Sequence, residues 1–180
     1  MVGIAKIVLK AVIISALIIF LTKLSALFPF YMTIVVETFN LANIAAADNY
    51  VKEPYFDAAL QGLQERPLFN LRPDDVKITI FNEDGRRAVG SADEYDYLEA
   101  EDRDKPYMQR GKTVQIRIEA WYPFEFTMWG RPVGFDVPIS FSLDTIGLKY
   151  YKDLPLDDDP YTDEDLDDIT YFDDLWDETE

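Results

Sequence analysis

The stretch Ala11–Val36 reads AVIISALIIFLTKLSALFPFYMTIVV and decides the architecture of this chain. Its only charged residue is Lys23. As an α-helix the stretch would be about 39 Å long, and a hydrocarbon core needs roughly 20 apolar residues. Because a soluble domain of this size rarely buries such a run on all sides, we interpret residues 1–36 as a transmembrane anchor.

Two other interpretations of the apolar stretch stay open. A cleaved signal peptide has an apolar part of about 7–15 residues followed by a cleavage site between small residues. Here Lys23 is followed by a second apolar block, and Ala45–Ala47 lies too far downstream. The third interpretation is the core helix of a soluble domain.

The charges around the stretch predict its orientation in a cell membrane. Lys6 and Lys10 precede it without any acid, whereas Glu37 and Asp48 follow it. The positive-inside tendency places residues 1–10 in the cytoplasm and residues 37–180 outside, as a single-pass protein. The bilayer and other membrane helices are therefore the expected partners.

Lys23, Pro29 and Glu37 are the candidate residues for helix assembly. An ionised lysine at a membrane centre costs roughly 2.5–3.5 kcal/mol, so Lys23 either snorkels towards the headgroups or pairs with a carboxylate of a neighbouring helix. Glu37 lies about 21 Å further along the helix and is within reach only of a staggered second chain. Pro29 predicts a kink. Close helix contact is also favoured by small residues, namely Ser15, Ala16, Ser25 and Ala26.

The helical pattern continues beyond the membrane segment. Apolar residues recur along one helical face of residues 38–66, with a bend or an interruption expected at Pro54 and an end at Pro67. The members of this face are Leu41, Ile44, Val51, Tyr55, Ala59 and Leu63. We therefore predict one long helix whose first half is apolar all round and whose second half is amphipathic.

The pattern then changes to the period of β-strands. Alternating residues predict strands, with a turn at Asn82–Gly85 and a charged surface loop over residues 91–110. The expected strands are Val76–Phe81, Arg86–Val89, Gly111–Phe126 and Phe135–Leu143. The expected fold class is α+β, in which residues 37–152 form a three- or four-stranded antiparallel sheet covered by the amphipathic half of the helix.

Residues 153–180 form an acidic tail that we expect to be disordered. They hold 14 of the 34 carboxylates and no Lys or Arg, so like-charge repulsion opposes their collapse. Three interpretations stay open: a solubilising tail, a partner-docking segment through Tyr171, Phe172 and Trp176, or a calcium loop. The calcium interpretation rests on four aspartates whose spacing matches part of a twelve-residue calcium-binding loop, namely Asp163, Asp165, Asp167 and Asp174. The usual glycine of such a loop is absent.

The composition excludes several classes of function. The chain has no Cys and no His, which removes disulfides, thiol and imidazole chemistry and Cys/His zinc sites. Its glycines are scattered and form no phosphate-binding loop. Residues 1–152 hold 20 carboxylates against all 17 basic residues, and no basic patch could neutralise nucleic acid. We expect no enzyme, cofactor, metal site, nucleic-acid partner or small-molecule substrate.

Three segments carry a resemblance to a known family. They are Ala45–Ala47 with the helix around them, the strand Lys112–Trp121, and the ending formed by Val137–Ser140 and Thr145–Tyr151. Over residues 5–152 the layout resembles that of TadE-like pseudopilins and of single-span proteins that accompany conjugation or secretion genes in Gram-positive bacteria. A prepilin site would place Glu at the fifth position after Gly3, where this chain has Val8. The resemblance therefore does not imply processing like that of a major pilin.

The resemblance implies a non-enzymatic, membrane-anchored, pseudopilin-like structural subunit of a pilus, secretion or conjugation assembly. Two alternatives stay open. One is an anchored extracellular binding module whose acidic tail docks a partner. The other is an accessory subunit of a membrane transport complex, with Lys23 buried against another protein.

Overall fold

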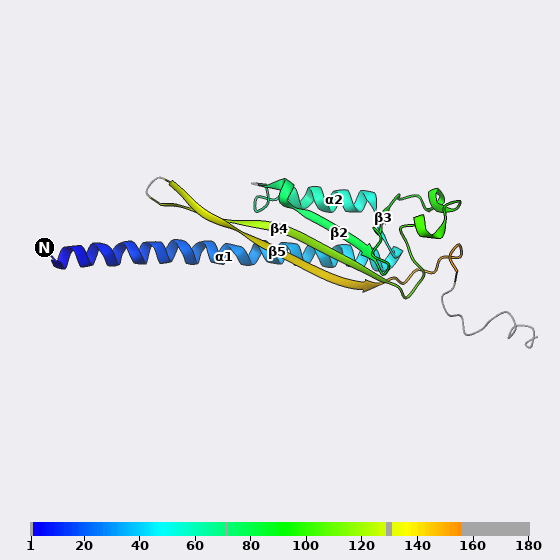
Figure 1. Ribbon diagram of the computed structural model, residues 1–180, viewed down its shortest axis with the longest axis horizontal. Helices are drawn as coiled ribbons and strands as arrows, with labels where there is room; N and C mark the ends of the chain where they lie inside the picture. The colour runs from blue at the N-terminus through cyan, green and yellow to red at the C-terminus, as the bar shows by residue number, and fades with distance from the viewer. Residues whose placement is uncertain (1, 71, 129–130, 156–180) are drawn as a thin grey trace, which may run out of the picture.

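The computed structural model of this protein describes residues 2–70, 72–128 and 131–155. A long helix, α1 (Val2–Asp48), is followed by β1 (Val51–Lys52) and a second helix, α2 (Glu53–Gln64). The remaining strands are β2 (Lys77–Asn82), β3 (Val89–Gly90), β4 (Thr113–Met128) and β5 (Arg131–Ile146). Three short 3₁₀ turns are η1 (Pro73–Asp75), η2 (Glu94–Tyr97) and η3 (Asp102–Asp104). The order confirms an α+β chain with a long N-terminal helix and a small antiparallel sheet (Figure 1).

The main sheet has three antiparallel strands in the order β2-β4-β5. Its buried face comes from the alternation seen in the sequence, and the register aligns apolar residues across the three strands. Ile118, for example, lies between Ile78 on β2 and Phe141 on β5. Such cross-strand rows stabilise a sheet only if their face is covered.

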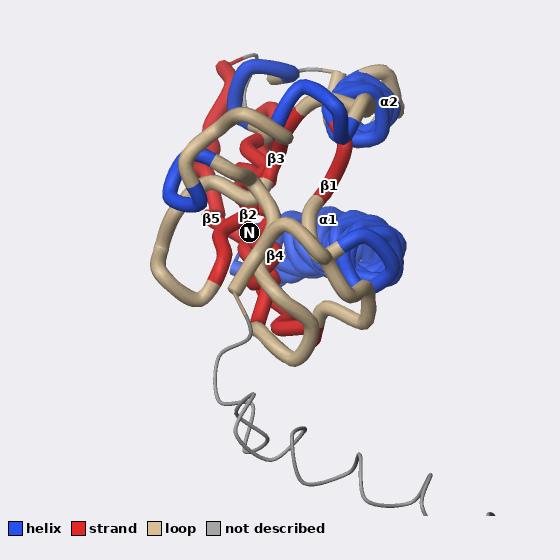
Figure 2. The backbone as a smooth tube through the Cα atoms, turned by 90° about the vertical axis from the view of Figure 1, so that its right-hand side faces the viewer, coloured by secondary structure: helices blue, strands red, loops and turns tan. Residues whose placement is uncertain are grey.

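The cover of this face is α1 together with α2. Phe30, Ile34 and Leu41 of α1 are buried with Ile116 and Ile118 of β4 in one hydrophobic cluster. A view along the long axis places both helices on the same side of the sheet (Figure 2). Since Phe30 and Ile34 are fully buried, the packed part of α1 begins inside the apolar stretch 11–36.

The prediction of one continuous helix running to Arg66 is wrong, and the interruption expected as an alternative at Pro54 lies a few residues earlier, between α1 and α2. The helix α1 ends at Asp48 because Asn49 adopts a φ of 59°, a left-handed conformation that Asn tolerates better than most residues. Pro54 stands in the first turn of α2, where its missing N–H breaks no helical hydrogen bond. The chain thereby reverses, and Arg66 lies 3.6 Å from the Glu37 carboxylate of α1.

The strand predicted at Arg86–Val89 is displaced. Val89–Gly90 forms β3, which pairs in parallel with β1 rather than extending the main sheet. The tight turn at Asn82–Gly85 is confirmed: the Gly85 N–H donates to the Asn82 carbonyl, and Gly85 has a φ of 75°. Glycine adopts this conformation without a steric cost.

The prediction of a surface loop at residues 91–110 is only partly right. Its first part contains η2 and η3 and is mostly exposed. Its last part enters the core, because Lys105, Tyr107 and Gln109 are buried. Gln109 explains the burial locally: its amide donates to the Tyr151 carbonyl and accepts from the Tyr151 N–H. The loop therefore closes the end of the domain.

Candidate membrane-assembly surface

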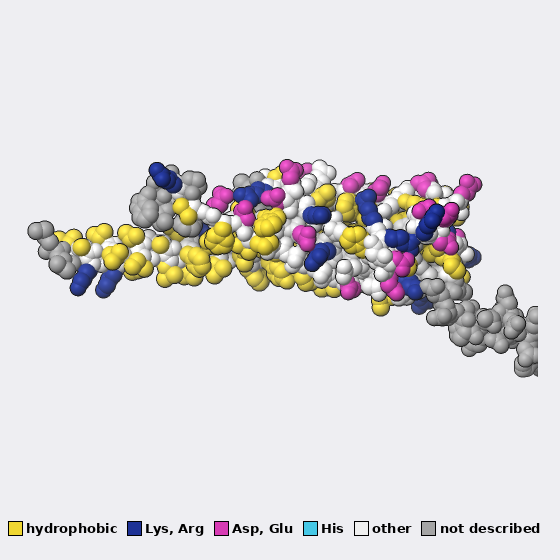
Figure 3. Space-filling model, viewed as in Figure 1, with side chains coloured by type: hydrophobic (Ala, Val, Ile, Leu, Met, Phe, Trp, Pro, Cys, Tyr) yellow, Lys and Arg dark blue, Asp and Glu magenta, His cyan; other side chains and the backbone are white. Residues whose placement is uncertain are grey.

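The N-terminal half of α1 is uncovered. No part of its most apolar 18-residue window is buried, and large side chains such as Ile13 and Phe28 are 58% and 67% exposed. Figure 3 shows apolar side chains along this half, whereas most acidic and basic side chains gather over the other end. By length and composition this helix could cross a membrane, either as an anchor or as a signal sequence. A helix buried inside a soluble domain would not present this surface to solvent.

A shallow groove, closer to an open surface than to a cavity, lies on this exposed half. Its lining residues recur every three or four positions, which places them on one face of the helix. They are Ile18, Leu21, Thr22, Ser25, Ala26 and Pro29. Ser25 and Phe30, which faces the sheet, are separated by about 140° around the helix axis. Most of the groove is therefore turned away from the domain, and its lining residue Ala26 lies at the margin, where it also packs against the hydrophobic cluster.

Small and hydroxyl side chains shape the groove. The Thr22 hydroxyl donates to the Ile18 carbonyl at 2.9 Å, so its polar group is satisfied within the helix. Pro29 stands inside α1 and has no N–H to donate to the carbonyl of Ser25. The Thr33 hydroxyl bonds back to the Pro29 carbonyl at 2.9 Å. The small side chains thus keep this face of the helix low, and the Ser25 carbonyl lacks its usual helical donor. Both features suit close approach of another helix.

The three predicted assembly residues lie at different levels of α1. Pro29 lines the groove. Lys23 is half-buried beside the sheet, and its backbone carbonyl accepts a hydrogen bond from the Tyr122 hydroxyl at 2.9 Å. Within the described residues, no carboxylate pairs with the Lys23 ammonium. Glu37 instead lies near Arg66 of the same chain. The structure does not bring Lys23 and Glu37 together within one molecule.

The opposite end of the domain is a polar and aromatic junction. Asn49 donates to the carbonyls of Met108 and Lys149 at 2.8 and 2.6 Å and accepts from the Lys149 N–H at 2.9 Å. The Tyr151 hydroxyl donates to the Asp48 carbonyl at 2.7 Å. These bonds fasten the end of α1 to the segment after β5. Sequence reasoning missed Asn49, although an Asn directly after a helix is a recognised signal for a left-handed cap.

A buried ammonium completes this junction. Lys105 lies within 3.0 Å of the carboxylates of Asp102 and Asp153, and the Tyr107 hydroxyl donates to Asp153 at 2.8 Å. Burial lowers the pKa of Lys105, but its hydrogen bonds to both carboxylates outweigh this effect and raise the pKa above its usual value. Burial likewise raises the pKa of Asp153, but the bonds from Tyr107 and Lys105 dominate and lower it.

A small pocket of about 200 Å³ adjoins the junction. Its carboxylates already have partners, because Glu94 pairs with Lys149 and Asp153 pairs with Lys105. Burial raises the pKa of Tyr107, which keeps its phenol protonated. No group of three or more acidic residues in the described part of the chain is arranged to hold a metal ion. The carboxylates that line this pocket therefore take part in contacts within the domain.

The candidate residues of the acidic tail lie outside the described residues. This applies to Tyr171, Phe172 and Trp176 and to the calcium candidates Asp163, Asp165, Asp167 and Asp174. The described part ends at Pro155, just beyond the Asp153 carboxylate that Lys105 holds.

No protein-family model matches this chain, and neither a curated protein nor a solved structure matches it.

Proposed function

We propose that this protein is a non-enzymatic, single-span membrane subunit whose α1 helix assembles laterally with other membrane helices. The observation that carries the proposal is the uncovered half of α1, with its groove from Ile18 to Pro29. In water this surface would expose a continuous run of large apolar side chains. A bilayer and a neighbouring helix provide the environment that such a surface needs.

The domain gives this helix a rigid extension. The packed half of α1 forms one hydrophobic cluster with the sheet, and Asn49 locks its end to the segment after β5. A helix held in this way transmits its orientation to the whole domain. Lateral contact between membrane helices would therefore also fix the spacing of the domains outside. This is the behaviour of a structural subunit, and the pseudopilin-like assembly implied by the family resemblance remains the favoured version.

The proposal places the N-terminus in the cytoplasm and the domain outside the cell membrane. Lys6 and Lys10 are exposed near the start of α1 without a neighbouring acid, whereas acidic and basic side chains are mixed over the other end of the molecule (Figure 3). This distribution supports the orientation expected from the positive-inside tendency.

A second candidate is an anchored binding module. It is favoured by the position of Asp153, which Lys105 holds at the end of the domain away from the exposed half of α1 (Figure 1). The acidic segment would begin there, clear of the membrane, where its carboxylates and aromatic rings could reach a basic partner.

Crosslinking of the full chain in native membranes distinguishes the two candidates. Lateral assembly predicts a ladder of homo-oligomers that persists after deletion of residues 156–180. The binding module predicts a single heterologous product that this deletion abolishes. A chain that remains monomeric at membrane densities, with no homo-oligomers captured, would contradict lateral self-assembly.

A further inference from the structure

The end of β5 and the segment after it expose a row of large apolar side chains. Ile146 is 56% exposed, Leu148 64% and Tyr150 49%, whereas Gly147 is buried. A Cβ added at Gly147 would lie 2.5 Å from the side chain of Asn49, so this side of the segment faces the end of α1. Alternate residues of an extended chain point to opposite sides. Ile146, Leu148 and Tyr150 therefore lie together on the outside, and we call them the apolar row.

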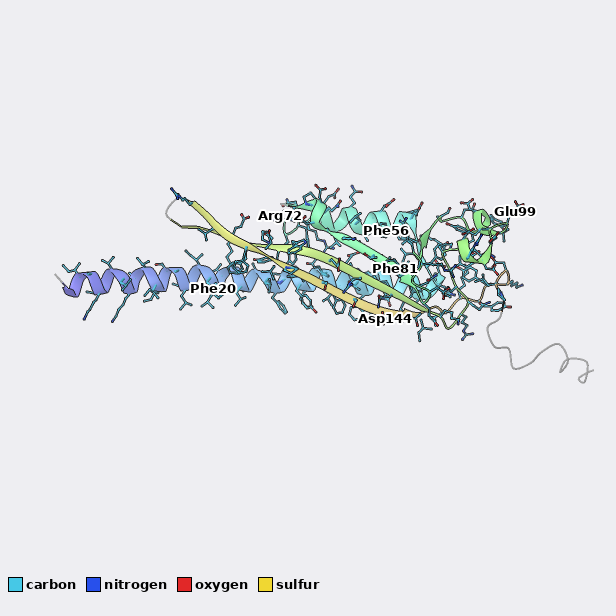
Figure 4. The ribbon with its side chains drawn as sticks, in the orientation of Figure 1. Phe20, Phe56, Arg72, Phe81, Glu99 and Asp144 are labelled. Carbon is cyan, nitrogen blue, oxygen red and sulfur yellow. The ribbon has the colours of Figure 1, made fainter. Side chains whose placement is uncertain are left out.

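Two exposed cations flank the apolar row. The N–H of Gly111 donates to the carbonyl of Gly147 at 2.9 Å, so the preceding residue, Arg110, lies alongside the row. Lys152 follows the row two positions after its last member, and both cations are exposed. In the described part of the chain, neither cation is paired with a carboxylate. The nearest acid on β5, Asp144, instead accepts a hydrogen bond from the Gln115 amide at 2.9 Å (Figure 4).

The position of the apolar row limits what can cover it. Figure 1 shows the end of β5 at the end of the domain remote from the exposed half of α1, so the bilayer that α1 would cross does not reach the row. Two cations are too few for a nucleic-acid surface. A segment that carries carboxylates and apolar side chains together matches both parts of this surface.

Residues 156–180 of the chain itself have this composition. They hold 13 carboxylates and no Lys or Arg. Four large apolar residues among them recur at spacings of three, three and four positions, which is the pattern of one helical face. They are Leu166, Ile169, Phe172 and Trp176. The sequence of this segment therefore combines an apolar stripe with the charge opposite to that of Arg110 and Lys152.

The chain is long enough for this segment to return to the apolar row. Tyr150 and Pro155 are five positions apart, so their Cα atoms are separated by at most about 18 Å. The 11 positions from Pro155 to Leu166 span at most about 40 Å, whereas the row itself is about 13 Å long. A short tether also keeps the segment at an effective concentration on the order of millimolar. A separate partner has to compete with it.

We propose that residues 166–176 dock on the apolar row of the same chain, with their carboxylates facing Arg110 and Lys152. The docked segment covers three exposed apolar side chains and pairs two cations. A basic partner of the second candidate function then binds only by displacing the segment from the row. This inference does not depend on a membrane span of α1.

Contact quenching by tryptophan tests this docking in the full chain. The chain has no Cys, so Asp144→Cys accepts a bimane dye beside the apolar row, where Trp176 quenches it on contact. Asp57→Cys also replaces an exposed aspartate and carries the dye on α2. It is the matched control, because Figure 4 shows its neighbour Phe56 on the other side of the molecule from Asp144. Each lipid nanodisc holds one chain, so any quenching arises within that chain.

The expected result is quenching that depends on both Trp176 and the position of the dye. Trp176→Phe should raise the emission several-fold at Asp144→Cys and leave it unchanged at Asp57→Cys. Equal emission with and without Trp176 at Asp144→Cys overturns the proposal. Equal Trp176-dependent quenching at the two dye positions also overturns it, because the segment would then touch the domain without preference for the row.

Substitutions on the row test which groups hold the segment. The double variant Arg110→Gln, Lys152→Gln should remove most of the Trp176-dependent quenching at Asp144→Cys. The double variant Lys77→Gln, Arg131→Gln removes two exposed cations elsewhere and lowers the net charge of the chain equally, so it should leave the quenching unchanged. Equal effects of the two double variants would overturn docking at the row, since net charge alone would then hold the segment.

Discussion

The Tyr122 hydroxyl, on β4, donates a hydrogen bond to the backbone carbonyl of Lys23, on α1, at 2.9 Å. The two residues are 99 positions apart in the chain. The bond joins the sheet to the helix at the level of the only charge in the apolar stretch. The packed and uncovered parts of α1 meet here, because Phe30 is buried while Leu21 is exposed.

Removing the Tyr122 hydroxyl should weaken this junction without disturbing its packing. Tyr122→Phe keeps the edge contact with the Phe30 ring, whose centroid is 5.2 Å away. It loses one hydrogen bond, and we expect the free energy of unfolding to fall by about 1 kcal/mol. Denaturant unfolding of the full chain in detergent micelles measures the change. Tyr95→Phe is the control, because Tyr95 is 79% exposed; an equal loss there would contradict the assignment.

Substitutions of Asn49 should lower the free energy of unfolding in two ways, by removing side-chain hydrogen bonds and by straining the backbone. Asn49→Gly loses three hydrogen bonds but tolerates a φ of 59°, so we expect a loss of about 2–3 kcal/mol in unfolding free energy. Asn49→Ala should lose about 1 kcal/mol more, because alanine resists the left-handed conformation. Thermal unfolding of both variants gives the comparison. Equal stability of the two variants would argue against the backbone contribution.

The ion pair of Lys105 and Asp153 predicts a defined pH dependence. The pKa of Asp153 is lowered on folding, so its contribution is present above the unfolded value of about 3.9 and is lost as the pH falls through the folded value. The pKa of Lys105 is raised, so its contribution is present below the unfolded value of about 10.4 and is lost as the pH rises through the folded value.

Asp153→Asn should therefore destabilise the protein by about 1 kcal/mol at pH 7, and the difference from the unmodified chain should shrink below about pH 4. Unfolding free energies of both proteins between pH 3 and pH 8 check this expectation. A difference that stays constant down to pH 3 would show that the ion pair contributes nothing.

A substitution of Lys23 tests whether its ammonium pairs with a carboxylate of a neighbouring chain, a question that the sequence left open. Because Glu37 already lies near Arg66 of its own chain, we expect Lys23→Leu to leave crosslinked oligomers unchanged in membranes. Lys23 then acts as a headgroup anchor rather than as a partner of a neighbouring carboxylate. Loss of oligomers in Lys23→Leu, restored by Lys23→Arg, would support the ion pair instead.

Local patterns predicted much of this fold. The alternation around Ile116 and Ile118 predicted β4, and the turn at Gly85 followed from its sequence context. The break after Asp48 was expected later, at Pro54, because the apolar spacing continues in register across it, through Leu41 and Val51. The spacing of apolar residues does not reveal a single residue in a left-handed conformation. Only the identity of Asn49 indicated that the helix ends there.

The candidate surface was only partly predictable. Ser25, Ala26 and Pro29 were recognisable from their size and backbone chemistry. Which part of α1 the domain covers depends on how far the β4–β5 hairpin extends. That extent is set by pairing between residues far apart in the sequence. The burial of Lys105 was equally hidden, because its two carboxylate partners lie 3 and 48 positions away and a charged loop normally indicates solvent.

Disulfide crosslinking at Ser25 tests the central claim most directly. In native membranes, Ser25→Cys places a thiol in the groove of α1, whereas Leu24→Cys places one at the same depth, about 100° around the helix axis and outside the groove lining. The account predicts that mild oxidation yields a disulfide-linked homodimer from Ser25→Cys and little from Leu24→Cys. Equal crosslinking at both positions, or none at Ser25→Cys, would contradict assembly through the groove.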